Sequence, residues 1–251
     1  MPAEPVEGAR DAASGLQLRW APDLDPEVAS LVRRDLEAIL APLAAFGRFS
    51  LPLTLLTVDD QQALAALAEA PVDGPLCAAA TSTRLILLRP CKWPQPPANH
   101  VLRTVLCHEL AHALLFQRCA PPGRDGAVAL PSWFREGMAV VASEGRPAAA
   151  RQRQVGLRRD AEALADADAL VMAQHPDAVY AVAAVSFDRW LQAFGDRRLA
   201  TLCRAMRQGR SFNDAFALAT GQTAQAWLAA THSALRAWAT DSAGGGGGGW
   251  S

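Results

Sequence analysis

The spacing of apolar residues changes once along this chain, and that change constrains the fold more than any other feature of the sequence. Before about residue 90, alternating or continuously apolar runs predict strands at 16–20, 51–58 and 83–90, with helices at 26–47 and 59–70 between them. From about residue 97 onward, every segment has helical spacing. We therefore expect an α+β fold, in which a small mixed sheet lobe is followed by a helical lobe.

Gly and Pro residues divide the helical region and mark the ends of the domain. The spacing predicts helices at 97–117, 132–143, 150–173, 178–194, 196–208, 211–220 and 223–239. Residues 1–15 are rich in Pro, Ala, Gly and acidic residues and are expected to be disordered, and the glycine tract of 241–251 is expected to be a flexible tail. One domain is expected over 16–240, with an α/β lobe at 16–117 and a helical lobe at 118–240.

Composition argues against several classes of protein. The net charge of −1 and the pI near 6.5 provide no electrostatic footprint for nucleic acid. No run of 18 apolar residues is present, so no membrane span is expected. No signal peptide is visible, which favours a cytoplasmic protein unless the true start lies upstream. The five cysteines are widely spaced and lack CxxC pairs, which favours reduced thiols. The oligomeric state cannot be predicted.

The stretch "VLCHELAHALL" at 105–115 carries the pattern H-E-x-x-H. Residues four apart lie on one face of a helix, so His108 and His112 can present their imidazoles to one zinc ion. Glu109 follows a ligand directly and can act as a general base toward a bound water. The alternative is a core helix whose histidines are satisfied without a metal. Cys107 falls on another face and is expected to pack in the core.

A catalytic zinc needs a third protein ligand. The three-histidine motif of the metzincins fails here, because Leu115 and Arg118 stand where that motif needs glycine and histidine. A carboxylate from a following helix remains, and Glu136 lies in the otherwise apolar segment "WFREGMAVVA". The alternative is that Glu136 belongs to a solvated helix face or pairs with Arg135.

Together, "HELAH" (108–112) and "PSWFREGMA" (131–139) resemble the gluzincins, and specifically the peptidase MA-like family. The resemblance implies a zincin-like fold, with Zn²⁺ held by His108, His112 and Glu136 and with Glu109 as the catalytic base. It also extends to "YAVAAVSFDRWLQAFG" (180–195), where a tyrosine precedes an S-F-x-x-x-L-x-x-x-G pattern.

Tyr180 is the single tyrosine of the chain and is expected to donate a hydrogen bond to the oxyanion of the reacting carbonyl. The alternative is a tyrosine packed between helices. His175 is a weaker candidate for the same role, because Pro176 follows it and a loop position is favoured.

Two departures from the family limit what the resemblance implies. Residues 74–88 lack the G-x-M-x-N segment of the aminopeptidase branch, so an endopeptidase is expected rather than an exopeptidase. Val140 stands where thermolysin-like enzymes carry an acidic residue that orients a ligand histidine, and Ser143 and Glu144 are the alternatives nearby.

The sequence thus predicts a zinc metallopeptidase, a hydrolase that acts on a peptide or protein substrate. The strand near 83–89 is expected to pair with an extended peptide beside the cleft. Two alternatives remain open: a non-catalytic, zinc-stabilised peptide-binding or protein-binding module on the same scaffold, and a metal-free helical scaffold.

Overall fold

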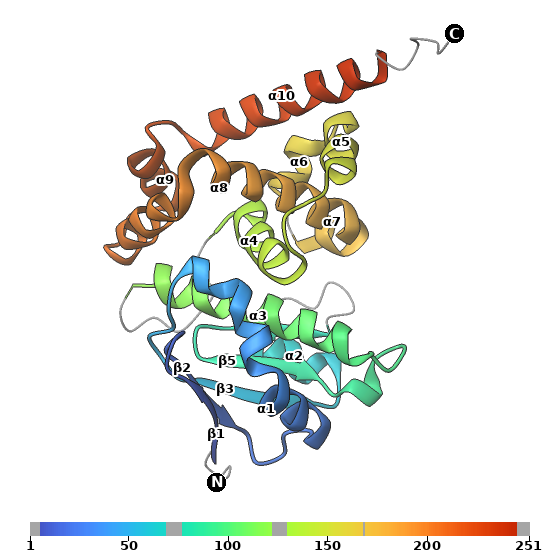
Figure 1. The fold of residues 1–251 in the computed structure, drawn as a ribbon, viewed down its shortest axis with the longest axis vertical. Coiled ribbons are helices and arrows are strands. Elements are labelled where there is room, and N and C mark those ends of the chain that lie inside the picture. Colours follow the sequence, from blue (N-terminus) through green and yellow to red (C-terminus); the bar gives the residue numbers. More distant parts are fainter. Residues whose placement is uncertain (1–5, 69–76, 122–129, 168, 245–251) are drawn as a thin grey trace. The chain divides into compact units, whose positions relative to one another are not determined.

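The computed structural model describes residues 6–68, 77–121, 130–167 and 169–244, and the chain divides into two compact units (Figure 1). The first unit contains Met1–Ala129 together with Cys203–Arg210, and the second contains Leu130–Leu202 and Ser211–Ser251. The sheet lies in the first unit and the second is helical, as the change in apolar spacing predicts. The return of residues 203–210 to the first unit was not expected from the sequence.

The first unit is built on a five-stranded mixed sheet with the order β1-β2-β3-β5-β4. Strands β2, β3 and β5 are parallel, whereas β1 and β4 run antiparallel to their neighbours β2 and β5. The strands are β1 (Val6–Asp11), β2 (Leu16–Trp20), β3 (Leu53–Val58), β4 (Ala78–Ala80) and β5 (Arg84–Leu88). The predicted strands at 16–20, 51–58 and 83–90 are confirmed as β2, β3 and β5.

Helices follow the strands where the sequence provides start signals. Helix α1 (Pro26–Leu40) begins after Asp25, whose side chain accepts hydrogen bonds from the backbone N–H groups of Glu27 and Val28. Pro26 occupies the first helical turn, where its missing N–H costs nothing. The remaining helical elements of this unit are η1 (Ala41–Phe46), α2 (Gln61–Ala68), η2 (Pro90–Lys92) and α3 (Asn99–Cys119).

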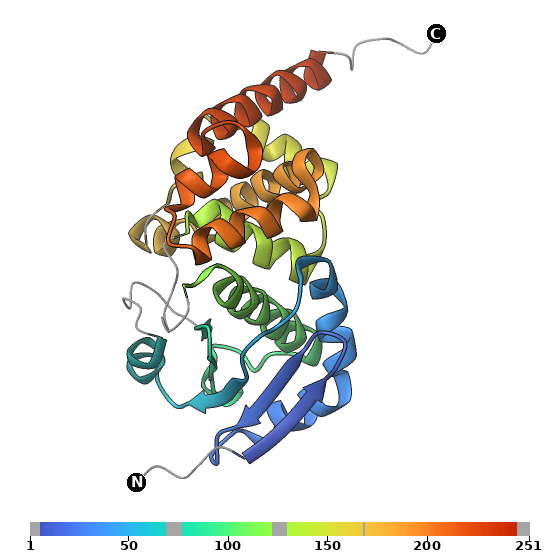
Figure 2. The ribbon, with the colours of Figure 1, turned by 90° about the vertical axis from the view of Figure 1, so that its left-hand side faces the viewer.

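The central strands β3 and β5 are covered on both faces, which explains their continuous apolar sequences. Val58, Ile86 and Leu88 form a core cluster with Leu64 of α2 on one face. The alternating partners, such as Leu55 and Leu85, are fully buried on the opposite face. Helices α1 and α2 lie on opposite sides of the sheet (Figure 2). Strand β2, near the edge, alternates buried and exposed residues instead.

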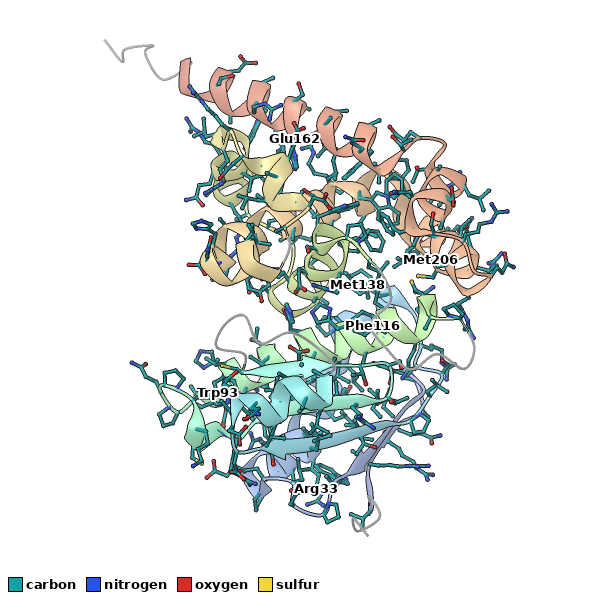
Figure 3. The ribbon with its side chains drawn as sticks, turned by 180° about the vertical axis from the view of Figure 1, so that it is seen from behind. Arg33, Trp93, Phe116, Met138, Glu162 and Met206 are labelled. Atoms are coloured by element: carbon teal, nitrogen blue, oxygen red, sulfur yellow. The ribbon has the colours of Figure 1, made fainter. Side chains whose placement is uncertain are left out.

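Strand β1 and the turn at 12–15 that follows it overturn the expectation of disorder over residues 6–15, while residues 1–5 lie outside the described part of the chain. The indole of Trp20 lies directly over Gly8, where a Cβ atom would stand 1.5 Å from Nε1. Glycine at this bulge therefore makes room for the ring. Arg33, labelled in Figure 3, places its guanidinium carbon 4.9 Å from the centre of the same ring.

The strand expected to pair with a peptide substrate is not at an edge of the sheet. β5 pairs with β3 along one side and with β4 along the other, so the prediction for 83–89 is wrong. The edge strand beside β5 is β4, whose run of three alanines provides little strand signal.

The second unit contains helices and no strand among its described residues. They are α4 (Ser132–Glu144), α5 (Ala149–Leu157), α6 (Ala161–Ala165), α7 (Ala169–Gln174), α8 (Pro176–Arg207), α9 (Phe212–Thr220) and α10 (Ala224–Gly244). The last residues of α8, from Cys203 onward, belong to the first unit. The single helix predicted at 150–173 is divided into three. α8 contains a break at Gly195, where φ is 73°, so the predicted division between 194 and 196 is confirmed.

An aromatic cluster forms the core of the second unit. Trp133 and Phe134 of α4 contact aromatic rings of α8, α9 and α10 at centroid distances between 5.2 and 6.3 Å. The other rings of the cluster are Phe187, Trp190, Phe194, Phe212, Phe216 and Trp227. The first turn of α4 is therefore anchored by large, buried side chains.

None of the described helices combines the length and apolar character needed to cross a membrane. The predicted glycine tail begins later than expected, because α10 continues through residues 241–244, and residues 245–251 lie outside the described part.

Candidate metal centre

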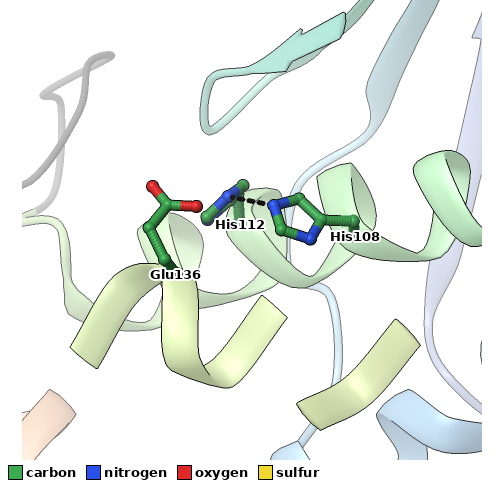
Figure 4. Close-up of side chains that lie close together, drawn as sticks. All are labelled: His108, His112 and Glu136. Carbon is green, nitrogen blue, oxygen red and sulfur yellow. Dashed lines mark hydrogen bonds between the residues drawn. The ribbon is translucent and has the colours of Figure 1, made fainter. Parts of the chain in front are cut away.

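Helix α3 presents His108 and His112 on one face, as their spacing predicts. Their Nε2 atoms are 3.1 Å apart, and the ring centroids are 4.7 Å apart (Figure 4). His112 is 7% exposed and also stacks on Phe116 one turn later. Two nitrogens that are each about 2.0–2.1 Å from one ion can be separated by 3.1 Å. Without an ion, the same distance is a hydrogen bond in which one imidazole donates to the other.

Glu136 is the third member of the cluster. One ligand atom from each of His108, His112 and Glu136 lies within 4.8 Å of the others (Figure 4). Glu136 is 6% exposed, and burial of a carboxylate is costly unless the charge is compensated. The solvated-face alternative for Glu136 is therefore wrong.

Arg135 provides part of that compensation. Its Nε donates a hydrogen bond to Oε1 of Glu136 at 2.8 Å, and its own side chain is 32% exposed. The pairing that the sequence left open therefore exists. A carboxylate has two oxygens and about four acceptor sites, so the hydrogen bond from Arg135 to Oε1 is compatible with a cation at the same carboxylate.

The glycine after Glu136 determines how closely α4 packs on α8. A Cβ atom at Gly137 would lie 2.3 Å from the carbonyl oxygen of Ala183 and 2.5 Å from Cβ of Phe187. Because the two backbones approach this closely, the position of Glu136 is fixed by main-chain packing as well as by its own hydrogen bond.

Tyr180 lies on the same face of α8 that meets Gly137. Residues 180, 183 and 187 are three and seven apart, which aligns them along one side of a helix. Tyr180 is half-buried, and its role as an oxyanion donor stays a prediction. His175 is exposed at the start of α8, and its charge acts on Asp160, whose pKa is lowered mainly by a hydrogen bond from Arg158.

Glu109 is 8% exposed on α3, next to the first histidine. A buried carboxylate adjacent in sequence to a candidate ligand histidine has the residue type that a general base requires, and that role stays a prediction. Cys107, on the other side of His108, is buried as predicted, and burial raises the pKa of its thiol to about 12.

Sequence reasoning missed the residue that attaches α3 to the sheet. Gln117 is 3% exposed, and its Oε1 accepts hydrogen bonds from the backbone N–H groups of Ser50 and Leu51 at 2.8 and 3.0 Å. Its Nε2 donates to the carbonyl oxygens of Leu51 and Ser82 at 3.0 and 2.8 Å. The chain around Ser50 leads into β3, and Ser82 lies between β4 and β5, so one amide fixes α3 to both strand connections. The sequence signal that could have revealed this attachment is a glutamine within an otherwise apolar face of the helix.

Neither of the two alternatives for orienting a histidine, Ser143 and Glu144, shows that role in its contacts. Val140 is buried, Ser143 donates to the carbonyl oxygen of Val140, and Glu144 pairs with Arg151.

The donor set of two imidazoles and one carboxylate fits zinc, since all three are groups that zinc binds and their atoms lie near one another. No protein-family model matches this chain, and no curated protein matches it.

Proposed function

We propose that the protein is a zinc-dependent metallopeptidase of the gluzincin type, similar to the peptidase MA-like family. The observation that supports this proposal is the convergence of His108, His112 and Glu136, from two helices, within 4.8 Å. The mixed sheet followed by helices is compatible with such a scaffold but does not identify it.

His108 and His112 would hold the metal through Nε2, and Glu136 would hold it through its carboxylate. When bound, zinc supplies an acidified water and polarises the scissile carbonyl. Arg135 would hold the Glu136 carboxylate in its orientation, because its Nε donates a charge-assisted hydrogen bond to Oε1.

The remaining chemistry belongs to two side chains of the protein. Glu109 would accept the proton of the attacking water and return it to the departing amine. Tyr180 would donate its phenolic O–H to the oxyanion that develops on the carbonyl. Both roles rest on the motifs that carry these residues and on their positions along α3 and α8.

Strand β4 is the element of the sheet that would bind an extended peptide. Among the described residues it pairs along one side alone, with β5, and it packs against α3, the helix that carries both histidines. An extended chain could therefore add to its outer side by backbone hydrogen bonds, with little dependence on side-chain identity.

The test combines zinc analysis with hydrolysis of a library of quenched fluorescent peptides by the full chain. Glu109→Gln should retain stoichiometric zinc and lose hydrolysis by about 10²–10⁴-fold, because the base is removed and the ligands are intact. His112→Ala and Glu136→Gln should lose zinc affinity as well, by about 100-fold or more.

Glu37→Gln is the matched control, because Glu37 is exposed on α1 and the same isosteric change there should alter neither property. Zinc retention with no hydrolysis by the unmodified chain would favour the non-catalytic binding module. Absence of zinc from the unmodified chain, even after reconstitution, would support the metal-free scaffold.

A further inference from the structure

Two cysteines that are far apart in sequence meet at the C-terminal end of α3. The Sγ atoms of Cys119 and Cys203 are 2.8 Å apart, although the residues are separated by 84 positions. Both belong to the first unit, and their exposed fractions are 0% and 2%. Both are present as thiols.

The distance between the two sulfur atoms is nearer to the length of a covalent S–S bond than to an ordinary packing distance. An S–S bond is about 2.05 Å long, so a small movement of either side chain from 2.8 Å would bring the atoms together. No backbone rearrangement is needed to bring the two side chains face to face, because they already touch.

The electrostatic surroundings distinguish the two thiols. The hydrogen bond from Cys119, together with the charges of Arg118 and Arg207, lowers the pKa of Cys203 against the opposing effect of burial. Burial, reinforced by its hydrogen bond to Cys203, raises the pKa of Cys119. Cys203 is therefore the thiol that ionises first, and the thiolate is the form that reacts.

We propose that Cys119 and Cys203 are a redox pair that closes to a disulfide when the protein meets a disulfide oxidant such as oxidised glutathione. The proposal does not depend on zinc or on peptidase activity. It differs from the expectation of reduced thiols, which rested on cysteine spacing in the sequence alone.

The reaction is a two-step thiol–disulfide exchange. The Cys203 thiolate attacks one sulfur of glutathione disulfide, the glutathione S–S bond breaks, and one glutathione thiolate leaves. The Cys119 sulfur, after losing its proton, then attacks the Cys203 sulfur of the mixed disulfide and displaces the second glutathione. Two electrons pass to the oxidant, and the two protons of the cysteines end on the two glutathione thiols.

The bond would tie residues 203–210 to the end of α3 and close a loop of 84 positions that contains all of α4, including Glu136. Oxidation would therefore restrict the unfolded chain without altering the side chains of the candidate metal centre.

The test uses the full chain with the two more accessible cysteines, Cys77 and Cys91, replaced by serine, which leaves three of the five thiols. The reduced protein is incubated with oxidised glutathione while folded, and a second sample is refolded from denaturant in the same redox buffer so that access cannot limit the reaction. Thiols are then counted in denaturant, and non-reduced digests are analysed by mass spectrometry.

We expect the thiol count to fall from three to one and a linked peptide to contain both Cys119 and Cys203. In the same background, Cys107→Ala should fall from two thiols to none. Cys119→Ala should lose at most one thiol, as the mixed disulfide of Cys203 with glutathione, and should give no linked peptide. Circular dichroism confirms that each variant is folded. The thermal midpoint of the oxidised parent should rise and return on reduction, with no shift in Cys119→Ala.

The proposal fails if all three thiols remain both in the sample oxidised while folded and in the sample refolded in the redox buffer. It also fails if Cys107 is the residue that enters the linked peptide.

Discussion

The two helices that carry the candidate metal ligands are buried by different means. α3 lies in the first unit beside a sheet of aliphatic side chains, and the amide of Gln117 connects it to the strand connections by four hydrogen bonds to backbone groups. α4 lies in the second unit within an aromatic cluster, and Gly137 allows its backbone to touch that of α8.

The different packing of α3 and α4 shows which contacts determine the position of each candidate ligand. The spacing of His108 and His112 is a property of one helix and needs no neighbour, whereas the sheet attachment decides where that helix points. Glu136 is a single ligand, so its position depends entirely on the contacts of α4. We therefore expect α4 to be the less tolerant of added volume and α3 to be sensitive to the loss of polar contacts.

Gly137→Ala should produce the largest loss of stability. The added methyl group would meet a carbonyl oxygen at 2.3 Å, and backbone cannot move aside as a flexible side chain would. We expect the free energy of unfolding to fall by about 3 kcal/mol, measured by denaturant titration, at the upper end of the range for overpacked sites. Hydrogen exchange should accelerate in the part of α8 around Ala183.

Ser143→Ala on the same helix is the control and should change stability by less than about 0.5 kcal/mol. If Gly137→Ala is as mild as this control, the close packing of α4 on α8 is not what positions Glu136.

Gln117→Leu should follow, with a loss of about 2 kcal/mol. The substitution keeps the apolar volume of the side chain but leaves the backbone groups of Ser50, Leu51 and Ser82 without their amide partner. Denaturant titration measures the loss, and faster hydrogen exchange at the last turn of α3 would locate it. Gln225→Leu, on an exposed face of α10, is the matched control and should be nearly neutral. Equal stabilities of the two variants would contradict the role of Gln117 in attaching α3 to the sheet.

Acidification should produce the smallest effect and should act through the second unit. His232 of α10 is 1% exposed, and its Nε2 is 3.0 Å from Oγ of Ser186 in α8. Its Nδ1 has no hydrogen-bond partner within the described structure. Burial lowers the pKa of His232 below its ordinary value of 6.5, so the folded protein favours the neutral imidazole.

The unfolded chain then binds more protons than the folded chain below pH 6.5. Stability contributed by neutral His232 is complete above that pH and is lost as the pH falls through the folded-state pKa. Thermal midpoints measured across this window should fall less steeply in His232→Gln. In His100→Gln, which alters an exposed histidine, the slope should match the parent.

The sequence predicted those features that depend on neighbours a few residues away. The helix of His108 and His112, the helix of Glu136 and the break at Gly195 follow from local spacing and from glycine. The three central strands follow from their apolar runs. Each of these signals is contained within one segment.

The features that sequence reasoning missed depend on partners far along the chain. β4 consists of alanines with poor strand propensity and forms because β5 offers it an edge. β1 forms because Gly8 accommodates the ring of Trp20. The contact between Cys119 and Cys203 joins residues 84 positions apart, and no local pattern indicates it.

The membership of residues 203–210 in the first unit has a practical consequence for dissecting this protein. A fragment that stops at Ala129 would lack the peptide that supplies Cys203, Ala205 and Met206 to the first unit, all of which are buried. Cutting the chain between the units would therefore strip part of the covering from the end of α3 and expose Cys119 to solvent. Neither half should be expected to behave as an autonomous fragment, and complementation of the shorter piece by a synthetic 203–210 peptide is the natural way to study it alone.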